Sequence, residues 1–230
     1  MKRTILLLLL ISISIILKAQ YNDDSYDWYP RQIGLKLGLN STTLNSSKNQ
    51  TAGISSQAES KFGYMANFSY WIPITQKFRP RIEVSYDVLN SEVGFIKTSK
   101  NGSSYSFNGE TRLTQGSIAI LPELVFGKNI QFSIFAGFQI SALISAHEKG
   151  TATTTDSMAT LSSVIIIDQK NNTIGEDVDT GFLTGFGARY RLSKKLFFNA
   201  ETRFRFGTSM VYDIYKPYYW GISAGLIYQL

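Results

Sequence analysis

Few residues of this 230-residue chain could do catalytic or metal chemistry. It contains no cysteine and a single histidine, His147, with Ser145 and Asp156 close by in sequence. A histidine with a serine and an acid can support nucleophilic hydrolysis, but this spacing matches no catalytic motif. There is no cluster of Cys or His that could bind a transition metal. We therefore expect no enzyme activity, no metal and no cofactor, and keep a lipid-modifying enzyme centred on His147 as an alternative.

The charged side chains are more informative, because they recur at every second position of several segments, and such positions share one face of an extended strand. The residues on this face are Lys36, Arg81, Glu83, Asp87, Glu123, Asp179, Arg189, Arg191, Glu201, Arg203 and Arg205. Charges inside a narrow barrel must pair, because an unpaired buried charge is costly. We predict a structural network in which three glutamates meet four arginines: Glu83, Glu123, Glu201, Arg81, Arg189, Arg203 and Arg205. The alternative is a gated path for ions.

The last segment, residues 218–230, shows most clearly the kind of strand that must position these charges. One of its faces is apolar with aromatic residues, and the other is small and mostly polar, which is typical of a strand between lipid and a packed interior. Its residues Ser223, Gly225, Tyr228 and Leu230 resemble the C-terminal signal by which outer-membrane β-barrels are recognised for assembly. An exposed apolar edge promotes aggregation, and closing the sheet on its first strand would remove that edge.

Eight segments alternate in this way, and the connections between them are long, short, long, short, long, short and medium. We expect strands over residues 32–40, 61–71, 78–90, 112–126, 130–145, 178–192, 196–207 and 218–230. The polar stretches 41–60, 91–110 and 146–177 are expected to be exposed loops, the last with a hairpin over 164–173. Pro122 predicts a bulge or kink in the fourth strand, since proline cannot donate a ladder hydrogen bond. Tyrosines and tryptophans near strand ends, such as Trp71 and Trp220, are expected at the water–lipid boundary.

The first residues form a leader. Lys2 and Arg3 precede an apolar run over residues 5–17, which suits a secretory signal peptide and is too short to span a bilayer as a helix. We expect cleavage after Ala19, giving a signal peptide of residues 1–19 and a barrel domain of residues 20–230. Removing Lys2, Arg3 and Lys18 lowers the formal charge from +6 by three to +3, so the charge gives no reason to expect nucleic-acid binding.

Together these features predict an all-β fold, an eight-stranded antiparallel transmembrane up-and-down β-barrel after a cleaved signal peptide. Outer-membrane barrels have an even number of strands, short periplasmic turns and longer external loops. A soluble exported barrel that binds lipid in its lumen is the alternative, although it would place its apolar face inward. The expected partners are outer-membrane lipid and the barrel-assembly machinery, and an envelope protein partner is left open.

Three stretches resemble the PorT-like outer-membrane β-barrel family. They are residues 120–124 (Ile-Leu-Pro-Glu-Leu), residues 132–137 with their continuation to Ser145, and residues 185–190 with the Lys-Lys turn that follows. The resemblance implies an outer-membrane barrel in a Gram-negative-type envelope, and it transfers no catalytic motif. Some members of that family are implicated in protein secretion and gliding motility. We therefore expect a structural or interaction role through long extracellular loops, and membership of such an assembly is left open; a small gated pore is a further alternative.

Overall fold

The computed structural model of the chain describes residues 30–46, 54–98, 103–127, 130–155, 162–171, 178–208 and 215–230. The expected signal peptide, its cleavage site and Asp156 lie outside these ranges. None of the described residues belongs to a helix long and apolar enough to cross a membrane.

Ten strands cover most of the described residues. They are β1 (Gln32–Ser46), β2 (Ile54–Trp71), β3 (Arg81–Thr98), β4 (Ser104–Leu121), β5 (Glu123–Phe126), β6 (Ile130–Thr155), β7 (Ser162–Asn171), β8 (Val178–Arg191), β9 (Leu196–Gly207) and β10 (Tyr215–Gln229).

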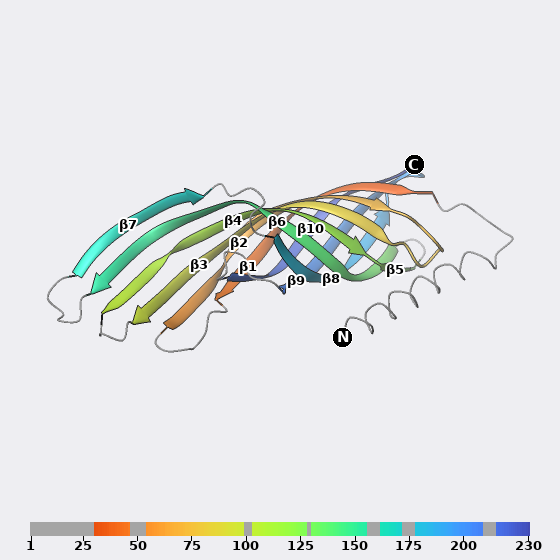
Figure 1. Cartoon of the computed structure of the whole chain (residues 1–230). Coiled ribbons are helices and arrows are strands. Elements are labelled where there is room, and N and C mark those ends of the chain that lie inside the picture. The colour runs from red at the N-terminus through yellow and green to blue at the C-terminus, as the bar shows by residue number, and fades with distance from the viewer. Residues whose placement is uncertain are drawn as a thin grey trace, which may run out of the picture.

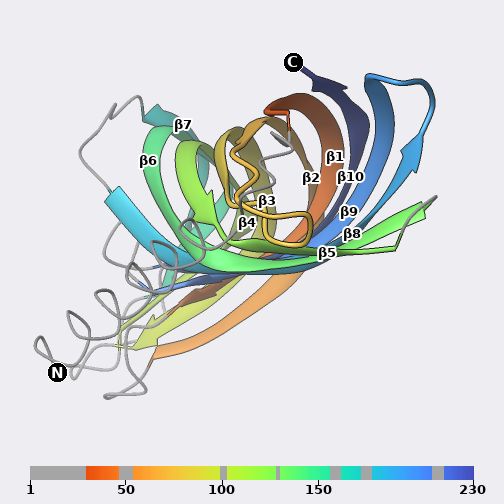
Figure 2. The same cartoon turned by 90° about the vertical axis from the view of Figure 1, so that its right-hand side faces the viewer.

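Eight of these strands form a closed antiparallel ring. The order is β1, β2, β3, β4, β6, β8, β9 and β10, and β10 pairs with β1 from Gln32↔Gln229 to Ser46↔Tyr215. Neighbouring strands in the chain are neighbours in the ring, so the barrel is of the up-and-down type (Figures 1 and 2). The predicted fold class is confirmed.

The two remaining strands extend this ring. β5 continues β4 beyond Pro122, and both strands pair with β6, so the interruption expected at the proline is present. The Pro122 carbonyl still accepts a hydrogen bond from the Ala136 N–H at 3.3 Å. β7 pairs with β6 from Ala146↔Asn171 to Thr155↔Ser162. This pairing lies beyond Ala142↔Val178, the last pair that β6 forms with β8.

The strands alternate between an apolar outer face and a polar interior. On β1, Leu37 is 64% exposed while the adjacent Lys36 is fully buried; on β6, Phe138 is 75% exposed while Gln139 is buried. A soluble barrel would have the opposite arrangement, whereas side chains that face lipid are apolar. Val88 departs from the alternation: it is only 1% exposed, close to a register shift between Ser60 and Tyr64 of the neighbouring β2.

The two ends of the barrel are unlike. At one end the connections are short, such as residues 193–195 between β8 and β9, and the Leu230 N–H bonds the Arg31 carbonyl. Gly127 has φ +93°, which allows the tight turn before β6. At the other end β2, β3, β4, β6 and β7 project well past the ends of β8 and β9 (left in Figure 1). By the general pattern of outer-membrane barrels, the short-turn end is periplasmic and the projecting end is external.

The prediction of long exposed loops was wrong for most of their residues. β3 and β4 remain paired to Thr98↔Ser104, and β4 and β6 to Ser104↔Thr155. The predicted hairpin within 164–173 was also wrong in its pairing, because Val164 and Lys170 belong to one strand, β7, whose partner is β6. These segments are rich in Ser and Thr, and threonine is favoured in strands, so a sheet in water has a composition similar to that of a loop.

Candidate functional site

The interior of the barrel holds the largest group of chemically active side chains. Ten charged residues are buried there among the described residues, five positive and five negative. They are Lys36 on β1, Arg81, Glu83 and Asp87 on β3, Glu123 on β5, Asp179 and Arg189 on β8, and Glu201, Arg203 and Arg205 on β9. All point inward because each occupies the interior position of its alternating strand.

The centre of this group is a five-residue cluster. The Lys36 Nζ lies 2.8 Å from both Glu83 Oε2 and Glu201 Oε2. Arg81 donates to Glu201 Oε1 at 2.6 Å, and Arg203 donates to Glu83 Oε1 at 2.7 Å and to Glu201 Oε2 at 3.2 Å. The two carboxylates are thus shared by three cations, and the cluster joins β1, β3 and β9 across the lumen.

A second group lies on the periplasmic side of the central cluster. Arg189 donates to Glu123 Oε1 at 2.5 Å, and the indole N–H of Trp71 donates to the other carboxylate oxygen. The guanidinium of Arg189 also lies 4.8 Å from the centre of the Trp71 ring, within range of a cation–π interaction. Trp71 is fully buried, so its expected position at the water–lipid boundary was wrong. Its polar edge serves the interior network instead.

A third group lies toward the external end. Arg205 forms an ion pair with Asp179 and donates to Ser141 Oγ at 3.2 Å. Asp87 accepts hydrogen bonds from the hydroxyls of Ser85 and Ser117, at 3.2 and 3.3 Å, and forms no ion pair with a described cation. The charges therefore follow the barrel axis in three groups, of which the first two are joined by Arg81 and Glu123 at 3.8 Å.

The seven residues proposed from the sequence for this network are all buried in it. The expected partners differ in one place: Arg205 meets Asp179 rather than a glutamate. Arg191 was wrongly placed on the inner face; it is exposed and donates to the carbonyls of Ser193 and Lys194 in the turn after β8. Lys36 was recognised as inward-facing but not as a member of the network, although it is the only cation on the inner face of the first strand.

Apolar layers lie on both sides of the charged groups. On the periplasmic side Trp71, Phe197 and Ile227 pack together. On the external side a larger layer consists of Leu89, Val93, Leu113, Leu143, Ala146 and Tyr219. Apolar side chains therefore flank the charged groups toward both ends, and Trp71 belongs both to an apolar cluster and to the second charged group.

The residues of the expected assembly signal lie on β10 and at its end. Ser223 and Gly225 face the interior, while Tyr228 and Leu230 are 44% and 54% exposed on the outside. A Cβ at Gly225 would lie 1.9 Å from the Leu35 carbonyl oxygen, so the close approach of β10 and β1 requires glycine there. This strand pair is the seam where the two ends of the chain meet.

The single histidine has a different partner from the one considered. His147 Nε2 lies 2.7 Å from Asp168 Oδ1 on β7, and both side chains are largely exposed. The hydrogen bond with His147 lowers the pKa of Asp168 below the ordinary value. No group of three or more His, Cys, Asp or Glu that could hold a metal occurs among the described residues.

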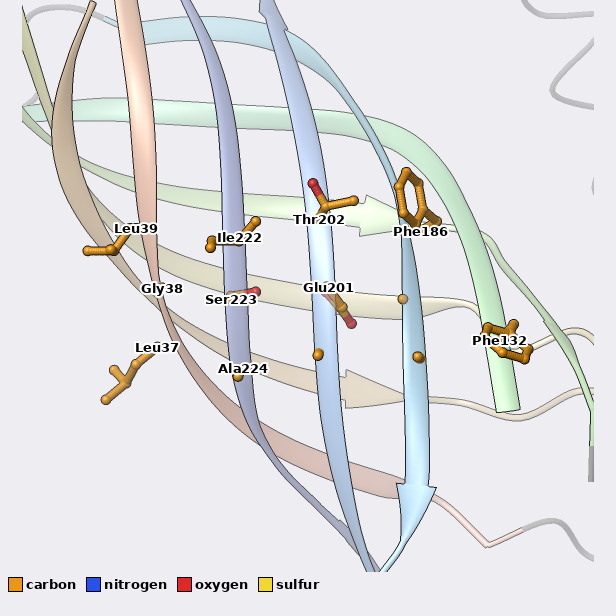
Figure 3. A pocket seen from close by; sticks show the side chains of 13 residues that line it. Leu37, Gly38, Leu39, Phe132, Phe186, Glu201, Thr202, Ile222, Ser223 and Ala224 are labelled. Carbon is orange, nitrogen blue, oxygen red and sulfur yellow. The ribbon is translucent and has the colours of Figure 1, made fainter. Parts of the chain in front are cut away.

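A groove of about 580 Å³ lies on the outer face of the barrel (Figure 3). Its floor is a row of alanines in register, Ala224, Ala200 and Ala188, between the larger Leu37 and Phe132. The hydroxyl of Thr202 on its wall already donates to the Gly221 carbonyl at 3.2 Å. The groove faces the lipid and offers apolar contact alone.

Comparison with known proteins agrees with this architecture. The model of the family described as "Outer membrane protein beta-barrel domain" matches residues 19–228. None of the curated proteins that were compared matches the chain.

Several solved structures are similar at low identity. Neisserial surface protein A is 14% identical, with 86% of this chain and 97% of that chain covered and a TM-score of 0.45. The outer membrane protein OprG from Pseudomonas aeruginosa is 10% identical, with 87% and 96% covered and a TM-score of 0.46. The outer membrane protease OmpT from Escherichia coli is 8% identical, with 91% and 99% covered and a TM-score of 0.36. Similarity at this level says nothing about what the chain binds or catalyses.

Proposed function

Because the chain belongs to the outer membrane protein beta-barrel domain family, we propose that it is an integral outer-membrane protein that holds an interaction surface outside the membrane. The barrel anchors this surface, and the projecting sheet of β2, β3, β4, β6 and β7 is the surface itself. The proposal includes no catalytic step, no metal and no cofactor.

The observation that carries the proposal is the length of the strands. β3 has 18 residues and β6 has 26, whereas a transmembrane β-strand needs about 9–11 residues. The additional residues remain in register between neighbouring strands, as in Lys97↔Tyr105 and Gly109↔Gly150. A paired sheet is more rigid than a loop, and a rigid surface loses less conformational freedom when a partner binds.

The filling of the interior weighs against the alternatives. A gated pore needs a polar path, and apolar clusters flank the charged groups toward both ends of the barrel. A soluble barrel that binds lipid in its lumen needs an apolar cavity, and this lumen is occupied by ten charged side chains. Planar-bilayer recordings of the purified chain should therefore show no discrete conductance steps. Steps that change with Glu123→Gln or Arg203→Gln would instead support the pore.

We propose further that residues 1–19 are removed on export, leaving residues 20–230, and that the barrel-assembly machinery recognises β10. The resemblance to the PorT-like family supports an envelope protein as the partner, within a secretion or motility assembly. The proposed envelope partner can be tested by altering the projecting sheet.

The test is a pull-down from gently solubilised envelopes of the native cell. One sample is the full chain, and the other is a variant with both projecting arms shortened, in which Gly94 is joined to Asn108 and Gly150 to Ile167. Each joined pair is a cross-strand pair, so the remaining strands keep their register. We expect a stoichiometric partner with the full chain and its loss with the variant. Recovery of the same partner by both chains would refute the role of the sheet.

A further inference from the structure

A second hollow, of about 500 Å³, lies on the outer face of β2, β3, β4 and β6. Its lining differs from that of the alanine groove because, apart from Phe62, it is polar, with the basic or imidazole side chains of Lys61, Arg112, His147 and Lys149, the amide of Asn90 and one acid, Glu110. Asn90, Arg112 and His147 are cross-strand neighbours in one row, and Glu110 and Lys149 are paired in the next row outward.

The hollow lies where lipid headgroups are expected. On β5 and β4 the exposed apolar residues run from Phe126 through Leu124 and Ile120 to Ile118. A membrane-crossing strand of about 10 residues that starts at Phe126 ends near Gly116. Arg112 is the first charged residue on the outer face beyond that point. On β6 the corresponding apolar run ends near Ile144, and His147 follows it.

The acidic groups around the hollow already have partners. Lys61 Nζ lies 3.2 Å from Glu92 Oε2 and also pairs with Glu110. Hydrogen bonding within this group lowers the pKa of Glu110 and raises the pKa of Lys61. Asp168 is engaged by His147 at 2.7 Å. These carboxylates lie in the outer row, farther from the membrane than Arg112.

The side chain of Arg112, in contrast, is fixed through its Nε, and its two terminal nitrogens are free. Its Nε–H donates to Asn90 Oδ1 at 3.1 Å, and the amide of Asn90 donates to the Phe62 carbonyl at 2.7 Å. Within the described part of the chain, the two terminal nitrogens of Arg112 and the Nζ of Lys149 form no hydrogen bond or ion pair. A fixed guanidinium with two free terminal NH2 groups matches the oxygens of a phosphate.

We propose that this hollow binds the phosphate of an anionic lipid in the outer leaflet, with Arg112 as the principal ligand and Lys149 and His147 beside it. Phe62, which is 71% exposed at the rim, contacts the apolar part of the same molecule. The lipid rather than free phosphate is the ligand because the hollow opens sideways at the membrane boundary. This inference rests on the outer-membrane location and is independent of the role proposed for the projecting sheet.

The experiment measures lipid retained by the full chain after extraction from phosphatidylcholine vesicles, by native mass spectrometry. The vesicles contain a minor fraction of a diphosphorylated glycolipid or of the same glycolipid without its phosphates. We expect the phosphorylated form to be retained about tenfold better, and Arg112→Gln to remove this preference, as loss of a hydrogen bond to a charged group predicts. The control is Arg191→Gln, which changes an exposed arginine at the periplasmic end and should leave retention unchanged.

Three outcomes would overturn the proposal: equal retention of the two lipids, an unaltered preference in both Arg112→Gln and Lys149→Gln, or displacement of the lipid by millimolar inorganic phosphate. The last would assign the hollow to free phosphate. Folding of each variant is verified by the heat-dependent shift of the barrel in gel electrophoresis. Failure of the pull-down would leave this result unaffected, so the two proposals can fail separately.

Discussion

Replacing Lys36 by methionine tests whether the interior network behaves as a buried one. The change removes a cation that lies 2.8 Å from two carboxylates and leaves five buried acids facing four buried cations. Removing one partner of a buried ion pair typically costs about 3–5 kcal/mol, because the remaining charge stays out of water. We therefore expect Lys36→Met to lower the free energy of unfolding by about 3–5 kcal/mol.

The chain offers a matched control in Lys61. Its amine also contacts two glutamates, but its side chain is 35% exposed and lies outside the membrane. Water screens such a pair, so Lys61→Met should have a much smaller effect. Both variants are unfolded with guanidinium chloride in lipid vesicles, and unfolding is followed by the fluorescence of the three tryptophans. If the two variants lose the same stability, the interior is well hydrated and the reasoning is wrong.

A double mutant identifies the origin of the loss. Lys36→Met combined with Glu83→Gln restores equal numbers of buried positive and negative charges. The stability lost should then be less than the sum of the single losses by about 1–3 kcal/mol. Additive losses would mean that Lys36 contributes through packing rather than charge.

Three further changes have defined outcomes. Gly225→Ala places a Cβ 1.9 Å from the Leu35 carbonyl oxygen and should reduce the yield of folded barrel in the outer membrane. Gly94→Ala is the control and should not reduce it, because a Cβ there has no neighbour closer than 3.9 Å. Equal yields of the two variants on heat-shift gels would contradict this reasoning. Trp71→Phe removes the donor to Glu123 and should cost about 1–3 kcal/mol in the same unfolding assay, and an unchanged stability would refute a structural role for that bond. The lowered pKa of Asp168 means that its pair with His147 stabilises the β6–β7 hairpin above the ordinary aspartate pKa and is lost as pH falls through the lowered value. At neutral pH, amide hydrogen exchange in β7 should thus be faster in Asp168→Asn than in the native chain. In strong acid the two chains should exchange at similar rates. A difference that persists in acid would show that it does not come from the charge of Asp168.

The sequence was sufficient to place the interior charges. Residues such as Lys36 and Arg203 follow a strict two-residue alternation, and the alternation has one physical cause, lipid on one side and a packed lumen on the other. It fails at Arg191, where β8 ends and the side chain turns back to the carbonyls of the following turn. At a strand end, alternation no longer decides which way a side chain points.

Partners across the lumen could not be predicted in the same way. Arg205 was expected to meet a glutamate and meets Asp179, because contacts across a barrel depend on how far each strand is shifted along its neighbours. The extent of the external sheet was also missed. Segments such as 91–98 and 104–110 carry only a few buried apolar side chains, such as Val93 and Phe107, among many polar residues, and composition then does not separate strand from loop.

The central cluster also bears on when the barrel can form. Lys36 lies on the first strand and its partner Glu201 on the penultimate one, 165 residues later. Its other partner, Glu83, lies on β3 only 47 residues away, so the first buried charge can pair early, but its full set of partners is complete only when nearly all strands have arrived. Contacts of such long range make folding slow and cooperative. Closure of the ring between β10 and β1 and completion of the charged network by β9 therefore both depend on the last strands of the chain.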